Sequence, residues 1–312
     1  MKKSWLAIPP VIGAFILTAA GVTWKNVFYM SEERKSRHWQ LPKGEQFEKD
    51  YGRMNELIAE AEAVPFEEIG IHSRDGLKLY GRYYAIREGA PLMLLFHGYH
   101  GHALRDFAGA HKICRENGLN MIVVDERAHA KSGGHTTTFG VKERYDILDW
   151  IDYANARFGN GQPIVLSGIS MGAASVCMAS ELDLPGNVKG IIADCPFSSP
   201  EGIIREVCRN HGWPERILWP VAWLGARLFG GVDLRVSTAV GAVRHAKVPL
   251  LLLHGEDDQL VPCAMGREIF RACGSKRRIE TFPGAGHGVS YLANPERYTQ
   301  AVVGFVERVT GV

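Results

Sequence analysis

The stretch Gly168-Ile169-Ser170-Met171-Gly172 decides the fold. It follows the apolar run 163–166 and precedes the helix-like segment 173–179. This pattern predicts a strand, a tight turn and a helix, with Ser170 at the apex of the turn and a strained backbone at that residue. The flanking positions are glycines because a side chain at either of them would not fit. The serine would stand above a sheet, at the N-terminus of a helix. It becomes a nucleophile only beside a base; the structural alternative is a tightly packed glycine-rich turn.

Short apolar runs recur along the chain, and each leads into a helical pattern. They are residues 91–96, 121–124, 163–166, 190–193 and 249–253. Such strands, alternating with helices, predict an α/β fold with a mostly parallel, twisted sheet and helices on both faces. Two alternating segments, 66–71 and 77–84, predict a hairpin before the first parallel strand. A last strand at 278–282 and a last helix from about 295 to 309 complete the pattern.

One segment between two predicted strands contains no strand of its own. Residues 199–246 are rich in tryptophan and leucine, with Trp213, Trp219 and Trp223 among them. The length favours a small helical insertion that caps the strand ends; the alternative is two ordinary crossover helices.

The N-terminus is unusually apolar. An uncharged run from Ser4 to Trp24 ends at Lys25, and 21 residues of helix would span a hydrocarbon core of about 30 Å. We therefore expect residues 1–25 to form a single-pass transmembrane anchor. A juxtamembrane linker over 26–64 would follow, with a helix in its amphipathic stretch around 51–63. A cleaved signal peptide, ending near Ala19-Ala20-Gly21, is one alternative. A soluble protein with a buried N-terminal helix is the other. Basic residues flank the run on both sides, so the side of the membrane stays open.

The composition of the chain gives no support for a nucleic-acid-binding protein or a metal-binding protein. The 312 residues carry a formal net charge of +2, which gives no reason to expect nucleic acid as a partner. The six cysteines are scattered and form no CxxC pair, so we expect free buried thiols and no metal site. The oligomeric state is not predictable from these data.

A nucleophilic serine needs a base and an orienting acid from other strand ends. His287, within Gly284-Ala285-Gly286-His287-Gly288, follows the last predicted strand and is the best base. The acid follows the strand 249–253, where Asp258 is favoured over Asp257 because it lies just before the next helix. Asp194, at the end of the preceding strand, is a third candidate. Three other histidines lie at or just after strand ends and are interpreted as structural: His97, His129 and His254.

An oxyanion hole needs two backbone N–H groups. One is expected from Met171, the residue after the nucleophile, and the other from Tyr99 in the loop after the first parallel strand. The Tyr99 side chain either lines an acyl pocket or is an exposed loop aromatic.

The order Ser170, Asp258, His287, with His97-Gly98 upstream, resembles the α/β-hydrolase superfamily over residues 65–312. The segment 125–132, DERAHAKS, resembles the D-x-R-G-x-G-x-S stretch of that superfamily, with Ala128 and Ala130 in place of the glycines. Within the superfamily the chain is most similar to anchored bacterial hydrolases of the serine aminopeptidase and acyl-esterase branches. The resemblance implies a serine hydrolase that needs no cofactor.

The leading functional hypothesis is a carboxylesterase acting on a moderately apolar acyl substrate through an acyl-enzyme. A peptidase for short peptides or a thioesterase is the enzymatic alternative, because the same triad serves all three reactions. A catalytically silent scaffold anchored at the membrane is the third hypothesis.

Overall fold

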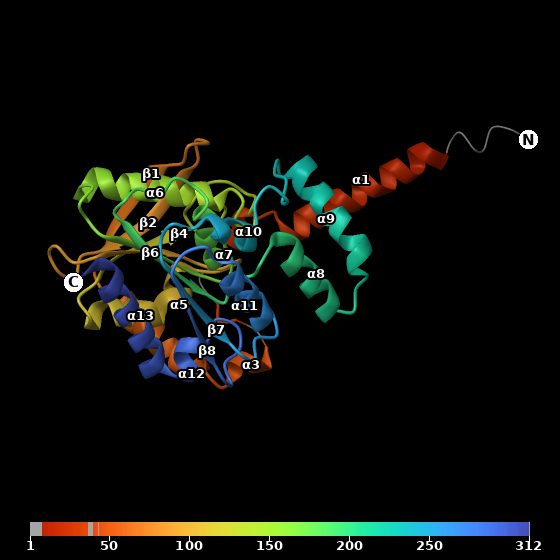
Figure 1. The fold of residues 1–312 in the computed structure, drawn as a ribbon. Helices are drawn as coiled ribbons and strands as arrows, with labels where there is room; N and C mark the ends of the chain where they lie inside the picture. Colours follow the sequence, from red (N-terminus) through yellow and green to blue (C-terminus); the bar gives the residue numbers. More distant parts are fainter. Residues whose placement is uncertain (1–7, 37–39, 43, 312) are drawn as a thin grey trace, which may run out of the picture.

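The computed structural model describes residues 8–36, 40–42 and 44–311, which fold around one eight-stranded sheet (Figure 1). The strands are β1 (Glu67–His72), β2 (Lys78–Tyr84), β3 (Leu92–Phe96), β4 (Asn120–Asp125), β5 (Ile164–Ile169), β6 (Val188–Asp194), β7 (Leu250–Gly255) and β8 (Arg277–Phe282). Their spatial order is β1-β2-β4-β3-β5-β6-β7-β8. The β1–β2 hairpin is antiparallel and β2 pairs antiparallel with β4, whereas all pairs from β4 to β8 are parallel. The predicted strands and hairpin are confirmed.

Helices cover both faces of the sheet, because the central strands are buried on both sides. All five residues of β3 are buried: Leu92, Leu94 and Phe96 belong to one core cluster, and Met93 and Leu95 to the other. The first cluster includes residues of α6 (Glu143–Phe158), α7 (Met171–Ala179) and α11 (Cys263–Ala272). The second includes residues of α5 (Ala103–Glu116) and α13 (Pro295–Thr310), with the short α12 (Ser290–Ala293) beside it. This is the layered arrangement that the apolar runs predict.

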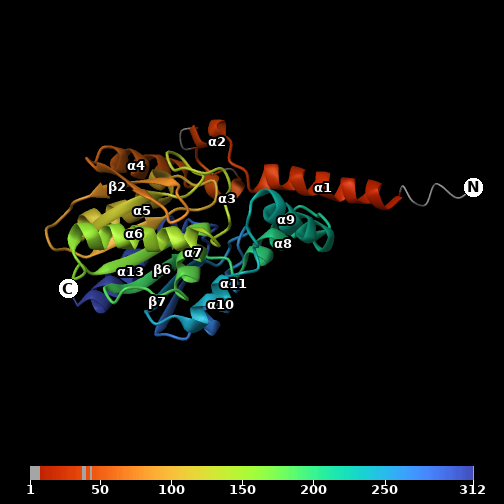
Figure 2. The same cartoon turned by 90° about the horizontal axis from the view of Figure 1, so that it is seen from above.

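The segment between β6 and β7 is helical. It forms α8 (Pro200–Asn210), α9 (Glu215–Phe229), α10 (Ala239–Ala242) and a 3₁₀ turn at Val243–His245. Helices α8 and α9 lie at one end of the sheet, beside the N-terminal helix α1 (Ile8–Val27) in both views (Figures 1 and 2).

Helix α1 packs closely on α9 through small residues. Ala20 is fully buried, and a Cβ added at Gly225 would lie 2.4 Å from the carbonyl oxygen of Ala20. The rings of Trp24 and Phe229 lie 6.1 Å apart at the same contact. The C-terminal half of α1 is therefore part of the folded domain, while its N-terminal half projects beyond α9 (Figures 1 and 2).

The expected transmembrane anchor over 1–25 needs correction. Over the residues that the structure describes, we find no helix with the length and apolar character needed to cross a membrane. The last turn of α1 contains Lys25 and Asn26, and Ala20 is buried against α9. Residues 1–7 lie outside the described residues.

The expected linker over 26–64 is also corrected, because its described residues pack on the domain. Phe28 is fully buried against Phe139, and the chain at Tyr29 pairs with Thr136. Three further helices follow: α2 (Glu32–Ser36), α3 (Glu45–Glu48) and α4 (Tyr51–Glu62). Helix α4 lies against α5 and buries Leu57 and Ile58. Sequence reasoning missed this packing because the segment is polar on average and its apolar residues are widely spaced.

Candidate active site

Ser170 lies at a strained turn between β5 and α7. Its backbone has φ 55° and ψ −112°, a region that residues with a side chain rarely adopt. The flanking glycines permit the turn: a Cβ at Gly168 would lie 2.3 Å from the backbone of Gly172, and one at Gly172 would lie 1.9 Å from the carbonyl oxygen of Phe96. Close backbone approach on both sides thus requires glycine at both positions.

The three predicted side chains come together at the carboxyl edge of the sheet. His287, in the loop after β8, has its Nε2 2.9 Å from Ser170 Oγ. Its Nδ1 lies 2.7 Å from Oδ2 of Asp258, in the loop after β7. Strands β5, β7 and β8 are parallel, so residues that follow them meet at one edge.

Local hydrogen bonds hold Asp258 in its charged form. Its Oδ1 accepts the backbone N–H groups of Leu260, at 2.9 Å, and Val261, at 2.8 Å. Burial disfavours the charged carboxylate, but the charge of His287 and hydrogen bonds from His254, His287 and the Val261 N–H outweigh burial and lower the pKa of Asp258. Burial likewise opposes protonation of His287, but the charge of Asp258 prevails and raises the pKa of the imidazole.

The two alternative acids have other surroundings. Asp257 is exposed, and only its backbone joins the site, through a hydrogen bond to the carbonyl of Ala285. Asp194 is buried, and its Oδ2 accepts a hydrogen bond of 2.9 Å from the Tyr298 hydroxyl. Burial raises the pKa of Asp194 to about 6.

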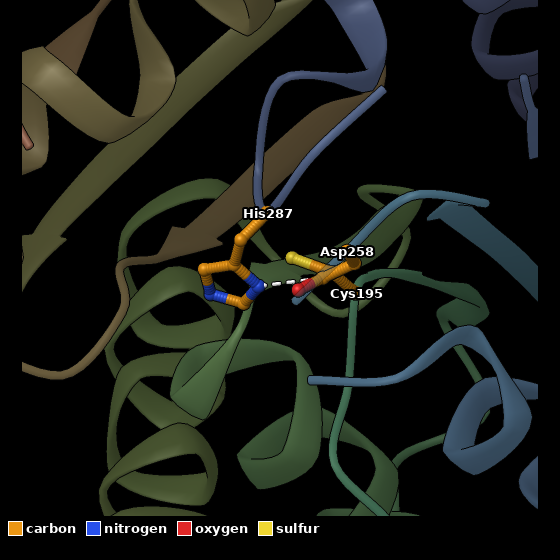
Figure 3. A group of neighbouring side chains, drawn as sticks. All are labelled: Cys195, Asp258 and His287. Atoms are coloured by element: carbon orange, nitrogen blue, oxygen red, sulfur yellow. Dashed lines mark hydrogen bonds and ion pairs between the residues drawn. The ribbon is translucent and has the colours of Figure 1, made fainter. Parts of the chain in front are cut away.

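A thiol lies beside the acid–base pair. Figure 3 shows Cys195 next to the hydrogen-bonded Asp258 and His287, and one ligand atom from each lies within 4.8 Å of the others. These residue types could hold a soft metal ion. The same His287 and Asp258 atoms, however, already bond to each other. All six cysteines are free and buried, which confirms that part of the prediction.

The two expected oxyanion donors lie at the start of α7 and in the loop after β3. In the described part of the chain, the backbone N–H groups of Tyr99 and Met171 have no protein acceptor. The Tyr99 ring lines the cavity beside Ser170, and its hydroxyl donates a 2.6 Å hydrogen bond to the carbonyl of Val27 at the end of α1. The prediction of an exposed loop aromatic is therefore wrong.

The three other strand-end histidines are buried and hold loops in place. His97 Nε2 accepts the Glu126 N–H at 3.0 Å, and His129 Nε2 accepts the His100 N–H at 3.2 Å. Burial lowers the pKa of His97 to about 3, so this ring is neutral. His254 Nε2 lies 2.8 Å from the carbonyl of Val261.

Sequence reasoning missed Asp106. Its Oδ2 accepts the Gly98 N–H at 2.9 Å, and this bond holds the loop that carries Tyr99. The only signal was an acidic residue in the first turn of α5, which is common in helices without any catalytic role.

A cavity of about 360 Å³ opens beside Ser170 and His287. It is lined by the Tyr99 loop, by α5 and α12, and by the N-terminal residues Pro42, Phe47, Met54 and Leu57. Among the described residues, none from 199–246 lines it. The helical insertion thus exists, and its described residues lie outside the lining of this cavity.

Comparisons with known proteins agree with the fold. Residues 88–234 and 225–291 match the serine aminopeptidase family. The chain is 22% identical to YqkD of Bacillus subtilis over 99% of this chain and 98% of that protein. It is 27% identical to lysophosphatidylserine lipase ABHD12 of Rattus norvegicus over 64% of this chain, which spans about half (49%) of that lipase.

Solved structures share the architecture. An esterase of Pyrococcus furiosus, Pf2001, aligns with a TM-score of 0.64 and 19% identity over 88% of this chain and 94% of its own. Est1E of Butyrivibrio proteoclasticus, solved with ferulic acid bound, aligns at 0.61 and 22% identity over 78% of this chain and 100% of its own. Together with the family match, these findings show that the chain belongs to the serine aminopeptidase family within the α/β-hydrolase superfamily and is a serine hydrolase.

Proposed function

We propose that this protein hydrolyses carboxylic esters through an acyl-enzyme on Ser170. The continuous contact from Ser170 Oγ to His287 Nε2, at 2.9 Å, and from His287 Nδ1 to Asp258, at 2.7 Å, carries the proposal. A hydroxyl in hydrogen-bond contact with a base that is itself held by an acid is the arrangement that activates serine for acyl transfer.

The steps follow from this geometry. Ser170 Oγ attacks the ester carbonyl while His287 Nε2 takes the hydroxyl proton, and Asp258 stabilises the imidazolium. His287 then gives the proton to the leaving alkoxide, so that an alcohol departs and the acyl group stays on Ser170. A water molecule, deprotonated by His287, releases the acid and restores the serine.

The backbone N–H groups of Tyr99 and Met171 are proposed as donors to the oxyanion of each tetrahedral intermediate. Both are free of protein acceptors in the described structure, and Met171 begins α7, where the helix dipole also favours negative charge. One such donor contributes about 3 kcal/mol of transition-state stabilisation in other serine hydrolases.

The substrate is proposed to be an ester with one apolar acyl chain. Apolar side chains of α5, α12 and the N-terminal segment line the cavity at Ser170, which suits an alkyl group. The relative ABHD12 of Rattus norvegicus is a lysophosphatidylserine lipase, which supports a substrate of this class. A peptidase or thioesterase is the alternative.

We further propose that the protein contacts a lipid surface without spanning it. Phe15, Ile16 and Leu17, on the projecting half of α1, are 74%, 42% and 50% exposed. Ile217 and Leu228 on the neighbouring α9 are 64% and 52% exposed. A projecting apolar helix beside an exposed apolar stripe suits the boundary between lipid headgroups and acyl chains.

Hydrolysis of p-nitrophenyl esters by the full-length protein and by its Ser170→Ala variant tests the enzymatic proposal. We expect the variant to lose about 10⁵-fold or more of kcat, as other serine hydrolases do without their nucleophile. Ester hydrolysis that survives in Ser170→Ala would exclude the proposed nucleophile. If no ester is cleaved while a fluorophosphonate still labels Ser170, the alternative substrates are favoured.

A further inference from the structure

The cavity beside Ser170 has one wall from a segment that lies far from the catalytic residues in sequence. Phe47 and Leu57 are 7% and 2% exposed, and both line the cavity together with Pro42 and Met54. All four are apolar and belong to α3, α4 or the chain just before them.

Residues of α5 and α12 continue the apolar lining of the cavity. Phe107 and Ala108 line it from α5, and Tyr291 and Leu292 line it from α12. Leu57 of α4 shares a small core cluster with Ala108, and Tyr291 and Leu292 pack against this cluster. An acyl chain on Ser170 would therefore meet apolar side chains that their own packing holds in place.

Polar contacts fix the N-terminal wall in place. Arg105 Nη1 donates a 3.0 Å hydrogen bond to the carbonyl of Gln40, just before the wall. Lys49 Nζ donates at 3.3 Å to the carbonyl of Gly284, in the loop that carries His287. Lys112 Nζ pairs with Glu60 at 3.1 Å, beyond the wall. These contacts attach the wall to α5, next to the Tyr99 loop, and to the loop that carries His287. The wall is thus preorganised for binding.

The wall lies outside the part of the chain that matches the family, which begins at residue 88. The helical insertion, within the matched part, contributes no residue to the cavity lining over the described residues. Its helix α9 packs on α1 instead.

We infer that Pro42, Phe47, Met54 and Leu57, and not the helical insertion, form the acyl-binding wall and set the longest acyl chain that the enzyme accepts. The cavity of about 360 Å³ falls within the size range of small-molecule sites. The preferred substrate class is therefore an ester whose acyl chain fits between these residues and Ser170, with longer chains disfavoured. This inference rests on the proposed ester hydrolysis at Ser170.

Two matched variants test the inference. Met54→Trp fills the cavity from the N-terminal wall, and Leu218→Trp places the same ring on α9, away from the cavity lining. The measurement is kcat/KM for p-nitrophenyl esters from acetate to palmitate. One methylene group in an apolar pocket changes kcat/KM by about tenfold or more.

For Met54→Trp we expect the ratio of decanoate to acetate hydrolysis, both measured on the same variant, to fall at least tenfold relative to wild type. We expect Leu218→Trp to keep the wild-type chain-length profile. An unchanged profile in Met54→Trp, with the profile altered in Leu218→Trp, would overturn the inference while leaving ester hydrolysis intact. If the wild-type protein hydrolysed none of these esters, that result would instead contradict the proposed function.

A second measurement uses the unaltered protein, so it does not depend on a variant that folds. An alkyl p-nitrophenyl phosphonate forms a phosphorus–oxygen bond with Ser170 and releases p-nitrophenolate. With a ten-carbon chain that ends in a diazirine, it reports by photo-crosslinking where the chain end lies. Crosslinked peptides that include residues 41–57 support the inference; crosslinks confined to peptides outside that segment contradict it.

Discussion

The carboxyl edge of the parallel sheet and the N-terminal region before β1 meet at one cavity, but they contribute to it in different ways. The sheet edge supplies the polar groups, each fixed by a strand that ends beside it: Ser170, Asp258 and His287. The N-terminal region supplies apolar surface through its packing on α5. Substitutions at the sheet edge should therefore affect the chemical step, and substitutions in the N-terminal region should affect substrate choice and stability.

The largest contrast is expected between two adjacent carboxylates. Asp258→Asn should reduce kcat by about 10⁴-fold, because the amide no longer stabilises the imidazolium or fixes its tautomer. Asp257→Asn is the matched control, and it should stay within about twofold of wild type because Asp257 is exposed. Steady-state kinetics on one ester measures both. If Asp257→Asn had the larger effect, the assignment of the acid would be wrong.

The turn at Ser170 provides the next contrast. Gly172→Ala should lower the free energy of unfolding by about 3 kcal/mol, because its Cβ would lie 1.9 Å from a backbone carbonyl. Gly304→Ala in α13 is the control, since nothing lies within 4 Å of its Cβ position; there we expect a gain of about 0.5–1 kcal/mol. Denaturant unfolding of both variants tests the prediction, which equal effects would contradict.

The pH dependence of kcat/KM should report the acid–base pair. The base must be neutral to accept the serine proton, so kcat/KM falls tenfold for each pH unit below the pKa of His287. The charge of Asp258 raises that pKa, so the acid limb should lie above the ordinary histidine value of about 6.5. In Asp258→Asn the residual activity should show its acid limb at lower pH. A limb that does not move would mean that another group controls it.

Tyr99, in the loop after β3, connects the sheet edge to the N-terminal region through its hydrogen bond to Val27. Tyr99→Phe removes the hydrogen bond to Val27 but keeps the backbone N–H that is proposed as an oxyanion donor. We expect the free energy of unfolding to fall by about 1 kcal/mol and kcat to stay within about threefold. A fall in kcat of a hundredfold would mean that the end of α1 controls the chemistry as well as the packing.

The smallest effect concerns the loop after β4. Ala130 has φ 41°, and relieving this strain in Ala130→Gly should raise stability by about 0.5 kcal/mol, net of the added flexibility of the unfolded chain. The control Ala59→Gly, on an exposed helical position of α4, should lower stability by about 1 kcal/mol. Thermal unfolding distinguishes the two, and equal losses would contradict the strain at Ala130.

The sheet edge was predictable because local patterns determine it. Gly168 and Gly172 mark the turn directly, and each apolar run ends at a residue that the fold brings to one edge. The same holds for Asp258, which lies just before α11.

The N-terminal region was not predictable in the same way, because its role depends on partners far along the chain. The apolar character of α1 has the same pattern whether its partner is lipid or a helix 200 residues away, and Ala20 gives no sign of Gly225. Phe47 and Leu57 lie in a mainly polar segment whose partners are distant in sequence, so only the packed structure places them beside Ser170.

The most direct test of the central claim is to identify the residue that carries the acyl group. The full-length protein would be mixed with p-nitrophenyl decanoate, quenched in acid within one turnover, and digested for mass spectrometry. The account predicts a decanoyl adduct on the peptide that contains Ser170, and none in Ser170→Ala. A decanoyl adduct on any other residue during turnover would contradict this prediction. So would a burst of p-nitrophenolate release, the sign of a covalent intermediate, without an adduct on the Ser170 peptide.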